Sequence, residues 1–294
     1  VGHTPVLQAE IVAALARSDG ASLGHPAESR SDSVLGPSAL RIRGANPKGT
    51  PGAVLIDATV GDGGHAAALL RASGAGARLL GLDLDPVSLR EAAHVLAGFG
   101  DRVRLLQGTF ADMALLAREA GFSEATGILL DLGLRSGQLS ASRGFSFQGS
   151  SALDMRFDPS GAVPLPEPEH AALRRLAKAR GAFTAADILR RLREDELADV
   201  LWRYGDETHA RAIARAVVSA RRTSPMHTTS DLVRIVVQAL PPRARHGRLH
   251  AATRTFQALR IAVNREFESL TRGLEDALGL LARGGRLAVI AYHS

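Results

Sequence analysis

The sequence predicts an α/β fold in which a doubly wound parallel sheet is interrupted by an inserted helical domain. Five short, mostly apolar runs alternate with helical segments, as expected of strands that are covered on both faces. A glycine-rich turn follows the first of these runs directly. Between the fourth and fifth runs lies a long stretch with helical periodicity and no convincing strand. Together these observations indicate a Rossmann-like sheet with an all-helical insertion.

The predicted elements follow one another along the chain without an internal repeat. Strands are expected at 54–57, 78–83, 103–107, 127–131 and 286–291, and helices from about His65 and from about Pro86. Asp85 directly precedes Pro86, which suits the residue that starts that helix. Helical periodicity in the insertion covers 194–222, 230–240 and 253–282, and three prolines between Gly161 and Glu169 mark its beginning.

The domain boundaries follow from this pattern. We expect residues 1–150 and 262–294 to form the sheet domain and residues 151–261 to form the helical insertion. Residues 18–52 are rich in glycine, serine, proline and alanine, with few large apolar groups. They are therefore expected to form a flexible loop between an N-terminal helix and the first strand.

Composition restricts the class of protein. The chain has 294 residues, of which 45% are hydrophobic, so it can bury a substantial core. It contains no cysteine, which excludes disulfides and thiolate metal sites. No apolar run reaches the length of a membrane span, and the first residues lack the pattern of a signal peptide. A cytoplasmic protein without a membrane partner is the expectation.

The positive charge is concentrated in one region. The chain carries a net charge of +6, but residues 156–260 contain 19 Arg and Lys against 11 Asp and Glu. The rest of the chain is slightly acidic. This distribution suits a nearly neutral catalytic body with a module for a polyanion such as nucleic acid, although solvated helix faces would give the same count.

The turn after the first strand is a candidate cofactor site. Gly61, Gly63 and Gly64 let the backbone approach a ligand closely, and the free amides at the start of the next helix, expected at 66–70, favour polar or anionic groups. Asp83 ends the second strand 22 positions after Gly61, close to the spacing at which a carboxylate meets ribose hydroxyls. Such a turn serves dinucleotides, S-adenosylmethionine or ordinary turn geometry.

Several sequence blocks occur in a characteristic order. They are His3-Thr4-Pro5-Val6-Leu7, Asp57-x-Thr59-x-Gly61-x-Gly63-Gly64-His65, Leu129-Leu130-Asp131-Leu132-Gly133 with Ser136 and Gln138-Leu139, Arg143-Gly144-Phe145-Ser146-Phe147, Leu153-Asp154-Met155-Arg156, the block from Ala252 to Asn264, and the block from Arg283 to Ser294. This ordered set closely resembles the bacterial RsmH (MraW) family of S-adenosylmethionine-dependent 16S rRNA cytosine-N4 methyltransferases. The resemblance covers the chain except residues 18–52.

The resemblance implies a class I methyltransferase fold and an activity. The family methylates the exocyclic N4 amine of a cytidine in small-subunit (16S) ribosomal RNA near the decoding centre, so 16S rRNA or the small ribosomal subunit is the expected partner, and a homodimer is possible. The cofactor S-adenosylmethionine is expected to contact Gly63, Gly64, His65, Asp83, Phe110, Asp131 and Gln138. Phe110 could cover the adenine or simply pack in the core. His65 could merely cap a helix, and it has no second histidine at ligand spacing, so no metal site is expected.

Two residues are candidates for the chemistry of methyl transfer. Asp131 ends the fourth strand beside the crevice where such sheets bind ligands, and it can accept a hydrogen bond from an amine. His293 follows the fifth strand and could relay a proton. The arginines Arg254, Arg260, Arg211 and Arg215 are expected to hold RNA phosphates, although each could instead be a surface ion pair. Aromatic residues make up 4% of the chain, which favours one flipped base over a stacked strand.

The chain departs from the family pattern in two places. Arg135 and Gly137 replace a serine and a proline, so the segment after Asp131 is expected to be a more flexible and more basic loop. The family also continues beyond His293-Ser294, so the sequence looks truncated. The loss of a terminal hairpin would leave the fifth strand as an exposed edge.

Two other functions use the same features. A nicotinamide-dependent oxidoreductase would bind NAD through the same sheet, but the Gly61-x-Gly63-Gly64 spacing lacks the third glycine of that motif. A non-catalytic RNA-binding or ribosome-assembly protein could retain the fold without the activity. Binding of S-adenosylmethionine distinguishes these alternatives.

Overall fold

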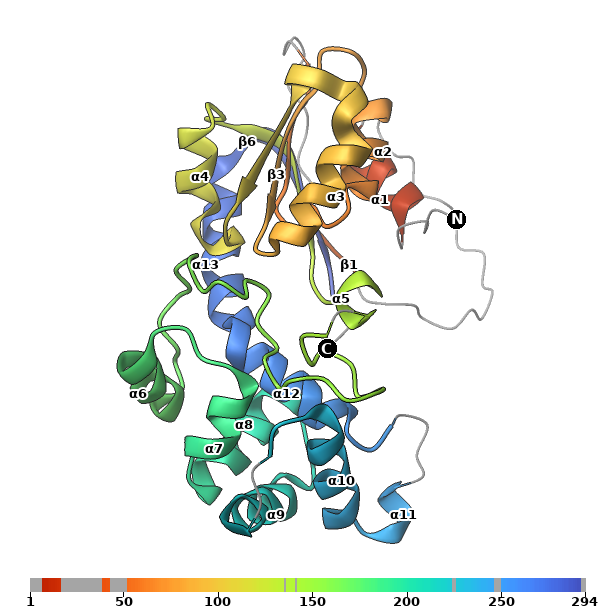
Figure 1. Cartoon of the computed structure of the whole chain (residues 1–294). Coiled ribbons are helices and arrows are strands. Elements are labelled where there is room, and N and C mark those ends of the chain that lie inside the picture. The colour runs from red at the N-terminus through yellow and green to blue at the C-terminus, as the bar shows by residue number, and fades with distance from the viewer. Residues whose placement is uncertain are drawn as a thin grey trace, which may run out of the picture. The chain divides into compact units, whose positions relative to one another are not determined.

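The computed structural model describes residues 7–16, 39–42, 52–134, 136–140, 142–223, 226–245 and 250–291. The chain divides into two compact units (Figure 1). The first comprises Val1–Gly133 and Leu270–Ser294, and the second comprises Leu134–Ser269. The unit boundaries lie near residues 133 and 269, compared with the expected 150 and 262, and the sequence block around Arg143 falls in the helical unit.

The first unit is built on a six-stranded sheet. Its strands are β1 (Ala39–Ile42), β2 (Val54–Asp57), β3 (Arg78–Asp83), β4 (Val103–Gln107), β5 (Ala125–Asp131) and β6 (Leu281–Ile290). The order across the sheet is β1-β6-β5-β2-β3-β4, in which β2 to β6 are parallel and β1 is antiparallel to β6. The order reverses between β2 and β5. Ligands of such sheets bind at the carboxyl ends of the strands beside this reversal.

Helices cover both faces of this sheet (Figure 1). They are α1 (Gln8–Leu15), α2 (Gly64–Ala72), α3 (Pro86–Leu96), the 3₁₀ turns η1 (Ala97–Arg102) and η2 (Phe110–Asp112), α4 (Met113–Glu119) and the part of α13 (Glu266–Leu280) that follows Ser269. Leu55, Leu79 and Leu129 pack in a cluster with α1, α2 and α3. Their neighbours Ile56 and Leu80 face the opposite way and pack in a cluster with α4 and α13. This burial on both faces explains why the strands are continuous apolar runs.

The predicted strands agree well with the observed ones, with two corrections. The fifth predicted strand begins earlier than expected, since β6 starts at Leu281. The expected loop 18–52 lies mostly outside the described residues, but it contains β1, which pairs with Leu287–Ile290 of β6. This stretch of β6 is therefore paired on both sides rather than an exposed edge. A strand within the loop was not foreseen because its pairing partner is more than 200 residues away in the sequence.

The second unit is helical. Its helices are α5 (Ser136–Ser140), α6 (Ala171–Arg180), α7 (Ala185–Arg191), α8 (Glu194–Gly205), α9 (Ala210–Thr223), α10 (Thr229–Ala239), α11 (Pro242–Arg245), α12 (Thr253–Asn264) and the start of α13. They enclose a separate apolar core that includes Phe183, Leu201 and Leu259. Capping boxes define the starts of α7 at Thr184 and α10 at Thr228. No helix in the described part of the chain is long and apolar enough to cross a membrane.

The helical periodicity located these helices but not their breaks. The stretch 194–222 divides at Asp206 and the stretch 253–282 at Arg265, and both residues adopt the left-handed conformation with φ of 48° and 54°. The segment after Asp131, expected to be a flexible loop, contains the short helix α5. Gly137 is exposed in that helix, whereas Arg135 lies outside the described residues.

Candidate active site

The glycine turn between β2 and α2 adopts a conformation that suits glycine. Gly61 and Gly63 have φ values of 58° and 88°, in the region that other residues rarely adopt. A Cβ on Gly63 would lie 3.2 Å from the Cα of Ala92 in α3. The turn is held to the sheet because Val60 donates its amide to the carbonyl of Leu82 at 2.8 Å. Glycine is thus needed here both for the turn and for the close approach of α3.

Asp83 lies at the carboxyl end of β3, where the sequence placed it. Its Oδ2 accepts the amide of Gly61 at 3.0 Å, and its Oδ1 accepts the amide of Asp85 at 2.8 Å. These bonds fix the orientation of the carboxylate and join the glycine turn to β3. The expected role of Asp85 is confirmed, since its side chain accepts the amide of Val87 and caps α3 ahead of Pro86.

The start of α2 differs from the expectation. The free amides were expected at 66–70. Because the helix begins at Gly64, its first amides lie before that range. The amide of Ala67 already donates to Gly63 within the helix, and that of Gly64 donates to Oδ1 of Asp62 at 3.1 Å. A carboxylate therefore occupies the first amide of α2. This arrangement makes the turn a poorer anion site than the sequence suggested.

Asp57 is a buried acid to which the sequence assigned no role. It ends β2, is 1% exposed, and accepts the amide of Thr59 at 3.3 Å through Oδ1. Within the described part of the chain, its Oδ2 has no hydrogen-bond partner. Burial raises the pKa of this carboxyl to about 8, and the charges of Asp131 and Asp83 also raise it, while the Thr59 amide lowers it. Asp57 is therefore mostly protonated at neutral pH.

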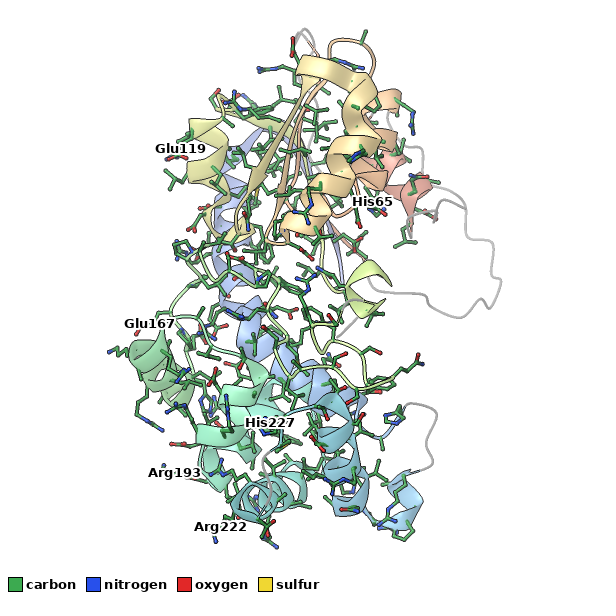
Figure 2. The ribbon with its side chains drawn as sticks, viewed as in Figure 1. His65, Glu119, Glu167, Arg193, Arg222 and His227 are labelled. Atoms are coloured by element: carbon green, nitrogen blue, oxygen red, sulfur yellow. The ribbon has the colours of Figure 1, made fainter. Side chains whose placement is uncertain are left out.

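Asp131 and His65 come together at the carboxyl end of β5. His65 lies in the first turn of α2 (Figure 2). Its Nδ1 is 3.7 Å from Oδ2 of Asp131, and the residue is 8% exposed. Thr59 connects this pair to β2, because its Oγ1 accepts the amide of Asp131 at 2.6 Å. Two residues predicted from separate sequence blocks are thus neighbours. The residue that joins them is Thr59, to which the sequence motif assigned no role.

The carboxyl groups of Asp57, Asp62, Asp83 and Asp131 define an acidic cluster on this edge of the sheet, in which Asp57 is mostly protonated. Their mutual influence is seen in the raised pKa of Asp57, to which each of the other three contributes. A positively charged ligand would relieve this repulsion, whereas a pyrophosphate would add to it. The residues present therefore fit a cationic cofactor better than a dinucleotide.

Phe110 follows β4 in the short turn η2, which Thr109 caps by accepting the amide of Ala111. Its ring is partly buried and lies against α13. A Cβ at Gly273 would come 2.6 Å from Cδ2 of Phe110, so glycine permits this contact. One side of the ring therefore has the packing role that the sequence left open.

The family comparison covers nearly the whole chain. Residues 1–164 and 169–294 match the MraW methylase family. The chain belongs to the MraW methylase family. Three similar proteins are each named ribosomal RNA small subunit methyltransferase H. That of Syntrophotalea carbinolica is 44% identical over 245 residues, which cover 83% of this chain and 72% of that protein. Those of Symbiobacterium thermophilum and Pelobacter propionicus are both 45% identical, and the matches cover 83% of this chain and 71% and 72% of those proteins.

Two further expected site residues of this MraW methylase stay predictions. Gln138 is buried in α5 of the second unit. His293 lies outside the described residues. The structure pairs Asp131 with His65, and the catalytic roles of Asp131 and His293 both stay predictions.

Three of the four arginines predicted for RNA form polar contacts within the helical unit. Arg260 forms a bidentate pair with Glu266 at 2.7 and 2.9 Å, and both side chains are less than one-fifth exposed. Arg215 pairs with Glu194 at 3.3 Å, and Arg254 donates to the carbonyl of Asp206 at 3.1 Å. Arg211 and Arg215 line a cavity of about 980 Å³ whose other lining residues include the carboxylates of Glu194, Asp195, Asp199 and Glu207. That lining carries more negative than positive charge.

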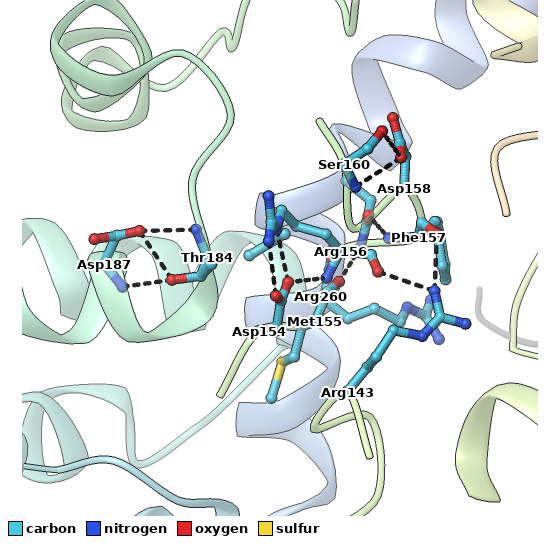
Figure 3. A network of polar contacts seen from close by, with 12 residues as sticks. Arg143, Asp154, Met155, Arg156, Phe157, Asp158, Ser160, Thr184, Asp187 and Arg260 are labelled. Atoms are coloured by element: carbon cyan, nitrogen blue, oxygen red, sulfur yellow. Dashed lines mark hydrogen bonds and ion pairs between the residues drawn. The ribbon is translucent and has the colours of Figure 1, made fainter. Parts of the chain in front are cut away.

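The Leu153-Asp154-Met155-Arg156 block of this methylase forms a polar network with α12 (Figure 3). Met155 is fully buried and has a φ of 62°, a strained conformation for a residue with a side chain. Asn264 holds it there by donating to the carbonyl of Met155 at 2.7 Å and accepting the amide of Phe157 at 2.8 Å. Arg156 pairs with Asp154 at 2.7 and 2.8 Å. The block is therefore part of the framework of the second unit.

Proposed function

We propose that this methyltransferase uses S-adenosylmethionine to methylate the exocyclic N4 amine of a cytidine in small-subunit ribosomal RNA. The names of its relatives support the substrate class, and the acidic cluster supports the cofactor. Bound S-adenosylmethionine would supply an activated methyl group on a sulfonium, together with an ammonium group, both of which are cationic. The cluster is the observation that carries the proposal, because its carboxylates favour these charges.

Four features of the sheet edge would hold the cofactor. The glycine turn provides close backbone approach at Gly63 and Gly64, and Asp83 stands at the end of β3 for the ribose hydroxyls. At the same strand ends, the buried Oδ2 of Asp57 has no hydrogen-bond partner among the described residues, so a ligand group could pair with it. Phe110 offers a flat apolar surface for the adenine. A cytoplasmic location accords with ribosomal RNA as the substrate.

The residues near β5 would act on the acceptor amine. The lone pair of the cytosine amine is delocalised into the ring, so the enzyme must orient the amine and accept its hydrogens as the new bond forms. Asp131 can accept such a hydrogen bond, and its position is determined by Thr59 and His65. The proton that leaves the amine passes to an acceptor of the protein or to water. We place Asp131 first in that role.

A direct assay tests this function. The protein is incubated with methyl-labelled S-adenosylmethionine and small-subunit particles or their RNA. The nucleosides of the RNA are then identified by mass spectrometry. N4-methylcytidine is expected. The absence of methylcytidine, under conditions in which a 45% identical relative produces it, would refute the proposal. Calorimetry is expected to show binding of S-adenosylmethionine and none of NAD.

A further inference from the structure

The positive charge of the helical unit is concentrated in a short part of it. Residues 171–193, which comprise α6, α7 and the residues up to the start of α8, contain seven Arg and Lys and one acid. The resulting charge of +6 equals that of the whole chain. The acids that follow in α8 are already engaged, because Glu194 pairs with Arg215 and Glu196 with Arg175. Arg174, Arg175 and Arg193 pair with acids outside the segment, namely Glu167, Glu196 and Asp195. The remaining positive charge is that of Lys178, Arg180, Arg190 and Arg191, against the single acid Asp187.

Three arginines converge on one oxygen of Asp187. The Oδ1 atom lies 3.5 Å from Nε of Arg180 in α6, 3.3 Å from Nη2 of Arg190 and 3.9 Å from Nε of Arg191 in α7. We call these three residues the arginine triad. Asp187 is 4% exposed, whereas the triad side chains are 43–52% exposed. Their guanidinium groups thus reach solvent from a buried anchor.

One carboxylate cannot neutralise the triad. Its Oδ2 is occupied by the capping box, where it accepts the amide and the hydroxyl of Thr184. Burial opposes ionisation of Asp187, but the bonds from Thr184 and the charges of Arg180 and Arg190 hold its pKa below the usual range. The carboxylate therefore carries one full negative charge against three positive ones. Two uncompensated positive charges therefore remain at the exposed guanidinium groups of the triad.

The triad differs in this balance from arginines that pair one-to-one with a carboxylate. Arg260 is matched to Glu266 and Arg215 to Glu194, one cation to one anion. A pair of one cation and one anion has little net attraction for a phosphate, because its two charges cancel. The triad has surplus charge and planar groups, each with five donors, which suit the oxygens of phosphates.

We propose that Arg180, Arg190 and Arg191 form a docking site for the phosphate backbone of the RNA substrate. The proposal rests on the proposed function, since it assumes that RNA is the substrate. Asp187 orients the guanidinium groups without neutralising them, and the two surplus charges bind about two phosphates. The triad provides affinity for the RNA and sets the position of its backbone, whereas the acidic cluster of the sheet holds the cofactor for methyl transfer.

The test measures RNA affinity as a function of salt. A fluorescent small-subunit rRNA fragment is titrated with wild-type protein and with a variant carrying Arg180→Gln, Arg190→Gln and Arg191→Gln, which keeps side-chain length and removes charge. Loss of two phosphate contacts is expected to reduce the slope of log K against log salt by about 1.4 and to weaken binding about 25-fold at 0.1 M salt. The matched control is Arg272→Gln. It removes an arginine that is 53% exposed and paired one-to-one with Asp112, so binding should change little.

A second variant gives an effect of opposite sign. Asp187→Asn leaves an amide oxygen for the Thr184 bonds and adds one net positive charge to the triad. Binding should become about fivefold tighter at 0.1 M salt, with a slope steeper by about 0.7. A purely structural role for the triad would lower the folded fraction of both variants, measured by circular dichroism, and leave the RNA affinity per folded molecule unchanged.

The outcomes separate this inference from the proposed function. If the wild-type protein forms no methylcytidine, the proposed function fails. If it forms methylcytidine but the triple variant binds RNA with wild-type affinity and salt dependence, the docking site is refuted. Methyl transfer by the triple variant that is restored at high RNA concentration would support it, because the defect is then one of binding.

Discussion

Replacement of the buried Asp57 by asparagine should remove a pH dependence of stability from the sheet unit. The carboxyl has a pKa of about 8 in the folded protein, compared with 3.8 for an ordinary aspartate. Between these values the folded state holds a proton that the unfolded state has lost. A raised pKa of this kind stabilises the fold at low pH, and the stabilisation is lost as the pH rises through about 8.

The magnitude follows from the proton difference. One proton released on unfolding lowers the free energy of unfolding by about 1.4 kcal/mol per pH unit, or about 2.7 kcal/mol between pH 5 and pH 7. Asp57→Asn cannot ionise, keeps an oxygen for the amide of Thr59, and should lack this slope. Asp101→Asn, at an exposed position of η1, is the control and should retain it.

The measurement is urea unfolding at pH 5, 6 and 7, followed by two probes. Circular dichroism reports both units, whereas the single tryptophan, Trp202, lies in α8 and reports the helical unit. In Asp57→Asn, the free energy of unfolding measured by circular dichroism should no longer fall by about 1.4 kcal/mol per pH unit. The free energy of unfolding measured by Trp202 fluorescence should depend on pH as it does in the wild type. Parallel pH slopes for wild type and Asp57→Asn would refute the assignment of a buried, protonated acid.

Three further predictions concern the site and its framework. Asp131→Asn should reduce kcat for methyl transfer by about 100-fold, because the amide accepts the amine hydrogen less well, and calorimetry should still detect cofactor binding. Gly63→Ala should lower the free energy of unfolding, measured by urea unfolding, by about 1–2 kcal/mol. The reason is that it places a Cβ at a φ of 88° and 3.2 Å from Ala92. The control is Gly137→Ala, where a Cβ meets open space. Asn264→Ala should destabilise the helical unit by about 2–4 kcal/mol in the Trp202 fluorescence transition, because it leaves the buried bonds at Met155 and Phe157 unmade. An unchanged transition midpoint in this last variant would contradict the role of Asn264.

The sheet could be predicted in most of its detail because its strands are local signals. Residues 54–57, 78–83 and 103–107 are apolar runs with the same bounds in the structure. The helix start at Pro86, with Asp85 as its cap, likewise depends on adjacent residues. Strand β1 could not be foreseen because its stability comes from pairing with β6, which local composition does not reveal.

The candidate site was predictable only in part. His65, Asp83 and Asp131 stand out in their sequence blocks, and the structure brings His65 and Asp131 to within 3.7 Å. Asp57 was overlooked because its raised pKa depends on burial and on the charges of three other strand-end and turn residues. The arginines show the same limit: the sequence reveals their number but not which of them have a matching carboxylate.

The sequence by itself determined the periodicity of the strands and helices, the glycine turn and the membership of the MraW methylase family, because these depend on residue identity and spacing. Only the tertiary structure decided which charges meet. It placed Asp57 at a buried strand end beside Asp131, and it gathered Arg180, Arg190 and Arg191 around one carboxylate. Electrostatic energies depend on distance and burial, which sequence order does not specify.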